Sequence, residues 1–164
     1  VSGLEDWVRR NPDDVAARTV LADTYLTRQD LKQAEAHYDI LVQARPGDPA
    51  LLNNAAWIAH ELGSPQALQY ARRAHAAAPA APEIADTLGW ILVQSGETAE
   101  GVELLRSAAA GAPSNQDVQY HLAYALRLTG AEDEAREILE KLVADDKPFA
   151  EREAAVELLG TIRR

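Results

Sequence analysis

Apolar residues recur along the chain at helical spacing, in pairs of helix-length segments that are separated by short turn signals. In the last segment, Ala155, Leu158, Leu159 and Ile162 alternate with charged residues, which places the four apolar side chains on one face of an α-helix. The turn signals between paired segments are Gln29-Asp30, Gly63-Ser64-Pro65, Gly96-Glu97 and Gly130. The pattern predicts an all-α chain built from helical hairpins.

Short sequence signals mark where several of these helices begin. Asp48 precedes Pro49 and Ser64 precedes Pro65, the arrangement of an N-cap residue followed by proline at the first helical position. Asp30 begins a sequence that resembles a capping box. We therefore predict helix starts at Pro49, at Pro65 and directly after Asp30.

A signature of small and apolar residues recurs about every 34 positions. It reads Leu21-Ala22 with Ala34 and Pro46, Ala55-Ala56 with Ala67 and Pro79, Leu88-Gly89 with Gly101 and Pro113, and Leu122-Ala123 with Ala135 and Lys147. A period of that length is typical of stacked helical hairpins. We place the four repeats at residues 15–48, 49–81, 82–115 and 116–147.

The segments outside the four repeats match the ends of such an array. Residues 1–14 resemble the second helix of a preceding repeat, with Trp7 at the site that Leu41 occupies. Residues 148–164 predict a C-terminal capping helix. Because the chain begins with valine and contains no methionine, we expect it to be a piece of a longer protein with further repeats upstream.

The small residues of the signature predict close contact between the two helices of a hairpin. Gly101 falls inside a predicted helix, where glycine costs about 1 kcal/mol relative to alanine. We expect a close approach to Gly89, the equivalent position on the partner helix, to offset that cost.

Composition and charge exclude several classes of function. The net charge of −10 argues against binding to nucleic acid or anionic lipid, and the basic residues form no stripe. The absence of cysteine excludes disulfides, thiolate metal sites and a cysteine nucleophile. No apolar run approaches the roughly 18 residues of a membrane span.

The repeat pattern resembles the tetratricopeptide repeat over nearly the whole chain. The resemblance implies a right-handed α-solenoid of four hairpins, in which the first helix of each hairpin lines a concave face. It also implies that the ligands are extended peptides or partner proteins. More narrowly, "NNAAW", "APEIADTLGWILVQSGE" and "YHLAYALRLTGAEDEAREILEKLVADDKPFAEREAAVELL" look like the C-terminal part of the repeat lipoproteins of exosortase (PEP-CTERM) exopolysaccharide systems.

Side chains on a second face of each first helix point away from the hairpin core and form the predicted ligand surface. They are Asp23, Asn53, Trp57, His60, Glu61, Asp86, Trp90, Gln94, Tyr120, Tyr124 and Arg127. Trp57, Trp90 and Tyr124 occupy the same site in successive repeats, so they predict an aromatic ladder that stacks on a partner. The alternative is that Trp57 and Trp90 only pack against the neighbouring repeat.

No catalytic or metal-binding constellation accompanies the repeats. The histidines, at positions 37, 60, 75 and 121, lack ligand spacing for zinc. Ser95 lies in "VQSGE", which is not the nucleophile elbow of a hydrolase. We therefore predict a protein that is not an enzyme and that uses no cofactor or metal.

Three functions remain open from the sequence. The first is a scaffold that binds a protein or peptide in the concave groove, the second is a module that contacts polysaccharide through the aromatic ladder, and the third is a passive spacer. The narrower resemblance implies a location in the bacterial periplasm or anchored at the outer membrane, with the cytoplasm as the alternative. We expect no nucleic-acid partner and no membrane insertion by this segment.

Overall fold

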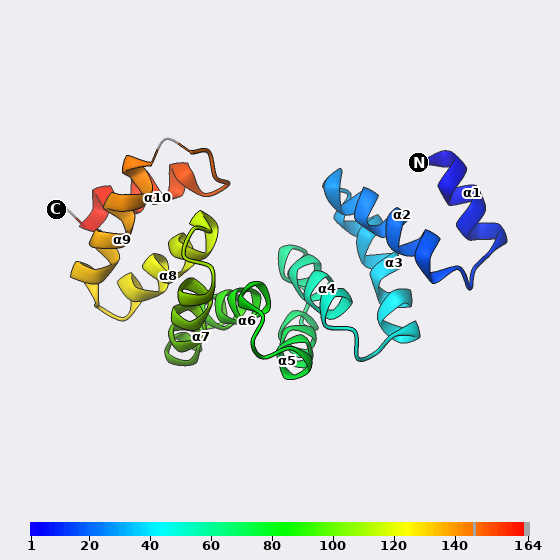
Figure 1. Cartoon of the computed structure of the whole chain (residues 1–164), viewed down its shortest axis with the longest axis horizontal. Coiled ribbons are helices and arrows are strands. Elements are labelled where there is room, and N and C mark those ends of the chain that lie inside the picture. Colours follow the sequence, from blue (N-terminus) through cyan, green and yellow to red (C-terminus); the bar gives the residue numbers. More distant parts are fainter. Residues whose placement is uncertain (146, 163–164) are drawn as a thin grey trace. The chain divides into compact units, whose positions relative to one another are not determined.

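The computed structural model describes residues 1–145 and 147–162, and these residues form ten α-helices and no β-strand (Figure 1). The helices are α1 (Ser2–Arg10), α2 (Val15–Thr27), α3 (Leu31–Ala44), α4 (Pro49–Glu61), α5 (Ala67–Ala77), α6 (Pro82–Gln94), α7 (Thr98–Gly111), α8 (Gln116–Leu128), α9 (Glu132–Ala144) and α10 (Arg152–Ile162). The predicted all-α fold is confirmed. Residues 163–164 of the predicted capping segment lie outside the described residues.

Helices pack in consecutive pairs, α2 with α3, α4 with α5, α6 with α7 and α8 with α9. Each pair falls inside one of the four ranges predicted for the repeats. Within a pair the two helices lie side by side and are joined by a short turn (Figure 1). The small residues of the signature are buried at these contacts, as Ala22 and Ala34 illustrate with 0% exposure.

The predicted close approach of Gly89 and Gly101 is confirmed. A Cβ atom on Gly101 would lie 2.8 Å from the carbonyl oxygen of Gly89 and 2.6 Å from Cγ2 of Val93. A Cβ atom on Gly89 would lie 2.8 Å from Cγ of Leu105. The pair α6–α7 therefore leaves no room for the alanines that the equivalent hairpin α2–α3 accommodates.

The chain divides into two compact units, Val1–Pro79 (unit 1) and Ala80–Arg164 (unit 2). In unit 1 the fully buried side chains include Leu21, Tyr38, Leu41 and Leu52. In unit 2 a hydrophobic core joins residues of α6, α7, α8 and α9 to Ala155, Leu159 and Ile162 of α10. Helix α10 thus covers apolar surface at one end of unit 2, as predicted for a cap.

Two of the three predicted helix starts agree with the structure. The side chain of Asp48 accepts hydrogen bonds from the backbone N–H groups of Ala50 and Leu51, and Asp30 accepts one from Gln33. The predicted start at Pro65 is wrong, because α5 begins at Ala67.

The turns inside the hairpins need a left-handed backbone conformation. Gly63, Gly96 and Gly130 have φ angles of 69°, 88° and 82°. In the first hairpin the same place is taken by Gln29, with φ of 60°. A side chain in this conformation costs roughly 1–2 kcal/mol, so the first turn carries local strain that the other three avoid.

Trp7, at the site equivalent to Leu41, has a different environment from that leucine. Its side chain is 53% exposed and its indole N–H donates to Asp14 at 2.9 Å, whereas the equivalent Leu41 is fully buried. Leu41 belongs to α3, which packs against the first helix of its own hairpin, α2. Among the described residues, α1 packs against α2 and has no such first helix beside it.

Candidate functional site

The best-defined group of predicted ligand residues lies in unit 2, on α6 and α8. Asp86 and Trp90 stand one turn apart on α6, and the buried Leu88 and Leu92 lie on the opposite side of that helix. On α8, His121 and Tyr124 also lie on neighbouring turns. We name the surface formed by Asp86, Trp90, His121 and Tyr124 the α6/α8 face.

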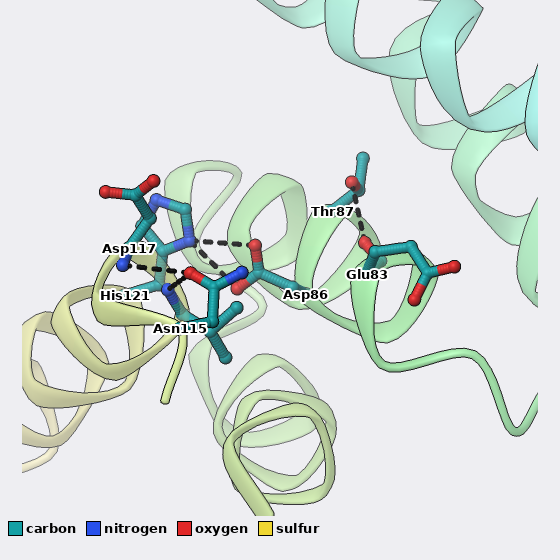
Figure 2. Close-up of polar contacts among 7 residues, drawn as sticks. Glu83, Asp86, Thr87, Asn115, Asp117 and His121 are labelled. Carbon is teal, nitrogen blue, oxygen red and sulfur yellow. Dashed lines mark hydrogen bonds and ion pairs between the residues drawn. The ribbon is translucent and has the colours of Figure 1, made fainter. Parts of the chain in front are cut away.

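The start of α8 is fixed by Asn115, whose side-chain oxygen accepts hydrogen bonds from the N–H groups of Asp117 (3.1 Å) and Val118 (3.3 Å) (Figure 2). This cap satisfies two of the free N–H groups that every helix leaves at its first turn. The register of α8 against α6 then places His121 opposite Asp86.

Asp86 and His121 connect the two helices. Nδ1 of His121 lies 2.9 Å from one carboxylate oxygen of Asp86 and 3.1 Å from the other (Figure 2). The two side chains are only 13% and 14% exposed, for His121 and Asp86 respectively. Because Nδ1 donates to the carboxylate, the imidazole ring is held in one orientation, with Nε2 as its remaining polar atom.

Trp90 packs on this fixed histidine. The indole and imidazole rings are stacked, with centroids 4.2 Å apart and an interplanar angle of 21°. Tyr124 meets Trp90 edge-on, at 5.2 Å and 66°. Trp90 and Tyr124 both remain partly exposed. Trp90 therefore has the contact with the next repeat that the alternative interpretation requires, and it also keeps accessible surface.

Tyr120 is the predicted ligand residue that the structure places deepest in unit 2. It is 7% exposed and belongs to the hydrophobic core. Burial raises the pKa of its hydroxyl, and the nearby Tyr124, Glu151 and Glu157 raise it further. In this structure its ring is shielded from solvent.

The predicted ligand residues of unit 1 have a more polar environment. The hydroxyl of the buried Tyr38 donates to the carboxylate of Asp23 and accepts from Nδ2 of Asn54 at 2.8 Å. Burial, followed by the bond to Asp23, raises the pKa of Tyr38. The side-chain oxygen of Asn53 is buried and has no hydrogen-bond partner among the described residues.

Four further predicted residues lie on α4 and at the end of α6. Trp57 and His60 are partly buried on α4, and Glu61 and Gln94 are exposed at helix ends. Trp57 belongs to unit 1 and Trp90 to unit 2, so the ladder that would join them stays a prediction.

Arg127, another residue of the predicted ligand surface, already has a carboxylate partner. Its guanidinium forms an ion pair with Glu132 at 3.3 Å, and both side chains are partly exposed. Its Nε atom is buried without a hydrogen-bond partner among the described residues. A ligand carboxylate would therefore compete with Glu132 for this arginine.

Sequence reasoning missed His121 and Tyr38 as site residues. His121 follows Tyr120 in the chain and is 35 positions from Asp86, one more than the repeat period. Comparison of equivalent positions pairs Asp86 with Tyr120 instead. A search one position beyond the period would have found the Asp86–His121 pair, because neighbouring helices cross at an angle and residues that touch are offset.

The described residues contain no group of three or more His, Cys, Asp or Glu side chains arranged to hold a metal ion. Within the same part of the chain, no helix combines the length and the apolar character required to cross a bilayer.

Two models of the tetratricopeptide repeat match the sequence, one at residues 4–49 and 19–82 and the other at residues 92–159. The chain belongs to the tetratricopeptide repeat family. No curated protein is significantly similar to it in sequence.

Several solved tetratricopeptide structures share the fold. MamA is 19% identical, with a TM-score of 0.70 over 91% of this chain and 82% of that protein. YrrB, described as a repeat protein with an unusual peptide-binding site, is 17% identical, with a TM-score of 0.73 over 94% and 79%. TTC0263 of Thermus thermophilus is 19% identical, with a TM-score of 0.71 over 98% and 87%. At these identities the likeness establishes the fold alone.

The family generally supplies non-enzymatic scaffolds for protein–protein interaction, and this tetratricopeptide chain has the fold of such scaffolds. The fold also occurs inside an enzyme, since the chain matches 25% of an O-GlcNAc transferase of Thermobaculum terrenum, with 21% identity and a TM-score of 0.72. None of these matches supports the narrower resemblance to exosortase lipoproteins.

Proposed function

We propose that this chain is a non-enzymatic scaffold that binds an extended peptide segment of a partner protein on the first helices of its hairpins, with the α6/α8 face as the principal contact. The observation that carries the proposal is the stack of Trp90 on His121, which Asp86 in turn holds in place. A partly exposed aromatic ring that is already fixed loses little conformational freedom when a ligand packs on it.

The chemistry of the face favours a partner segment with apolar or flat groups and with hydrogen-bond donors. Trp90 and Tyr124 offer ring surface, and such rings contribute most of the binding energy in many interfaces. Residues 80–164 contain 16 Asp and Glu against eight Lys and Arg, which favours a partner segment that is not strongly acidic.

Two alternatives follow from other readings of the same residues. A polysaccharide could stack on Trp90 and Tyr124, and a passive spacer would use the face only for contacts between repeats. The resemblance to exosortase lipoproteins is the sole source of a further proposal, that the scaffold works in a bacterial envelope or exopolysaccharide system, in the periplasm or anchored at the outer membrane.

The test selects binders for the whole chain from a phage-displayed library of random dodecapeptides and measures the affinity of the selected peptides by calorimetry. We expect Trp90→Ala and Tyr124→Ala to weaken binding about tenfold or more each, as truncation of a central aromatic contact does. Trp7→Ala, which removes an exposed tryptophan from α1, is the matched control and should leave the affinity unchanged.

Circular dichroism of each variant checks that the helices persist. If Trp90→Ala loses helicity, Trp90→Phe keeps a ring against His121 and still reduces the exposed surface. Peptides whose affinity is the same for wild type, Trp90→Ala and Tyr124→Ala would contradict the proposed face. An oligosaccharide array that yields binders where the peptide library yields none would favour the polysaccharide alternative, and failure of both would favour the spacer.

A further inference from the structure

Two carboxylates meet where the C-terminal cap joins unit 2. Asp117 lies in the first turn of α8, and Glu151 directly precedes α10. Each has one fully buried oxygen, Oδ1 of Asp117 and Oε2 of Glu151, without a hydrogen-bond donor among the described residues. Glu151 lies within hydrogen-bonding reach of Asp117. Two ionised carboxylates offer only acceptors, so this contact is favourable only if a proton lies between them.

Among the described residues, few positive charges are available to stabilise the pair in its doubly ionised form. His121, on the same face of α8, attracts Glu151, but its Nδ1 is bonded to Asp86 of α6. Arg152 of α10 donates to the backbone carbonyl oxygens of Asp145 and Val143. The lysines on this side, Lys141 of α9 and Lys147, are paired with Glu137 and Asp145 at 2.7 and 3.7 Å.

Within residues 1–145 and 147–162, the remaining titratable groups around the pair add negative charge or none. Tyr120 of α8 lies near Glu151 and also near Glu157 of α10. The environment of the pair therefore favours keeping one proton. The position of Glu151 links the pair to the cap. Phe149 and Leu158, on either side of Glu151 in the chain, both pack against the core of unit 2.

We propose that a single proton shared between Asp117 and Glu151 strengthens the docking of the cap α10, which packs on α9, and that loss of this proton weakens that docking. The inference concerns the protein without a ligand and does not depend on the proposed function.

The direction of the pH dependence follows from the surroundings of Glu151. Burial, and then the hydrogen bond with Asp117, raises the pKa of Glu151 from 4.5 to about 7. Between pH 4.5 and about 7, the Glu151 carboxyl keeps its proton when the cap is docked. When the cap is undocked, the same carboxyl loses its proton near its ordinary pKa of 4.5. Docking is therefore strongest at low pH within this window and weakens as the pH rises through about 7.

The experiment is hydrogen–deuterium exchange of residues 147–162 in the intact protein at pH 5.5, 6.5 and 8, with rates corrected for the intrinsic pH dependence of exchange. We expect the opening equilibrium of wild-type α10 to increase by about tenfold between pH 5.5 and 8. Residues of α6 and α7 should show no comparable change.

Two variants place a permanent donor in the pair. Glu151→Gln can donate to Asp117, and Asp117→Asn can donate to Glu151, so each should protect α10 at pH 8 as well as wild type is protected at pH 5.5. Glu153→Gln removes the same charge from an exposed position in the first turn of α10 and should keep the wild-type pH dependence.

A fourth variant, His121→Gln, tests whether the histidine, and not the carboxylate pair, causes the pH dependence. The proposal is overturned if exchange of α10 in wild type does not change with pH. The proposal is equally overturned if Glu151→Gln and Asp117→Asn retain the wild-type pH dependence. The same holds if His121→Gln abolishes the pH dependence and the two carboxylate variants do not. If Glu151→Gln does not fold, Asp117→Asn alone decides between these outcomes.

Discussion

Units 1 and 2 are built from the same repeat, yet they connect their helices through different chemistry. In unit 1 tyrosine hydroxyls donate to carboxylates, as Tyr38 does to Asp23 and Tyr70 does to Asp39 at 3.2 Å. In unit 2 the corresponding connection is a stack of rings, Trp90 on His121, fixed by the hydrogen bond between His121 and Asp86. The repeat period therefore sets where helices lie and leaves open which contacts join them.

The charge of the two units differs as well. Residues 1–79 contain ten Asp and Glu against eight Lys and Arg, so unit 1 is close to neutral, while residues 80–164 contain 16 against eight. Unit 2 thus combines most of the net charge with the ordered aromatic cluster and the Asp117–Glu151 pair. This comparison indicates that unit 2 is the more specialised half of the chain.

The largest expected effect tests whether the two units are separate. Leu41→Ala in unit 1 and Leu139→Ala in unit 2 each remove a fully buried side chain and should destabilise the protein by about 2–5 kcal/mol. Because repeats contact mainly their neighbours, hydrogen exchange should increase chiefly in the mutated unit. Equal increases in both units, for both variants, would show that the chain unfolds as one cooperative body.

A smaller effect tests the tight contact between α6 and α7. Gly101→Ala should destabilise unit 2 by about 1–3 kcal/mol, because the added Cβ would lie 2.8 Å from the Gly89 carbonyl oxygen. Helix propensity alone predicts the opposite, a gain of about 1 kcal/mol. Denaturant unfolding distinguishes the two signs. Ala34→Gly, at the equivalent position of unit 1, is the matched control and should cost about 1 kcal/mol.

The smallest effect tests the hydroxyl contacts of unit 1. Tyr38→Phe leaves Asp23 without its donor and Asn54 without its acceptor, and it should cost about 1 kcal/mol. Tyr70→Phe removes a hydroxyl that makes a single longer bond, so it should cost less. Unfolding of both variants in urea gives the comparison. A Tyr70→Phe variant that is the less stable of the two would refute the assigned role of the Tyr38 network.

Much of the fold could be predicted from the sequence, because the features that determine it are local or periodic. The turn signals at Gly96 and Gly130, the cap at Asp48 and the Gly89–Gly101 contact all depend on residues at fixed offsets within one repeat. The one wrong helix start has a local cause too. Helix α5 begins two residues after Pro65, so this proline lies in the turn before the helix.

The candidate site was predicted less completely. The sequence identified Asp86, Trp90 and Tyr124 as residues of one helix face, since that follows from a period of 3.6 residues per turn. It did not identify His121 as the residue that joins Asp86 to Trp90. It also gave no sign that Tyr120 is buried in the core of unit 2.

By itself, then, the sequence determined the helices, their pairing and the family, because hydrophobic periodicity and small-residue spacing act over short distances along the chain. Only the tertiary structure decided which side chains of different helices touch. The angle at which α8 crosses α6 brings His121 rather than Tyr120 to Asp86, and the return of the chain after α9 brings Glu151 to Asp117. Such contacts depend on the packing of whole helices, which no spacing within one repeat specifies.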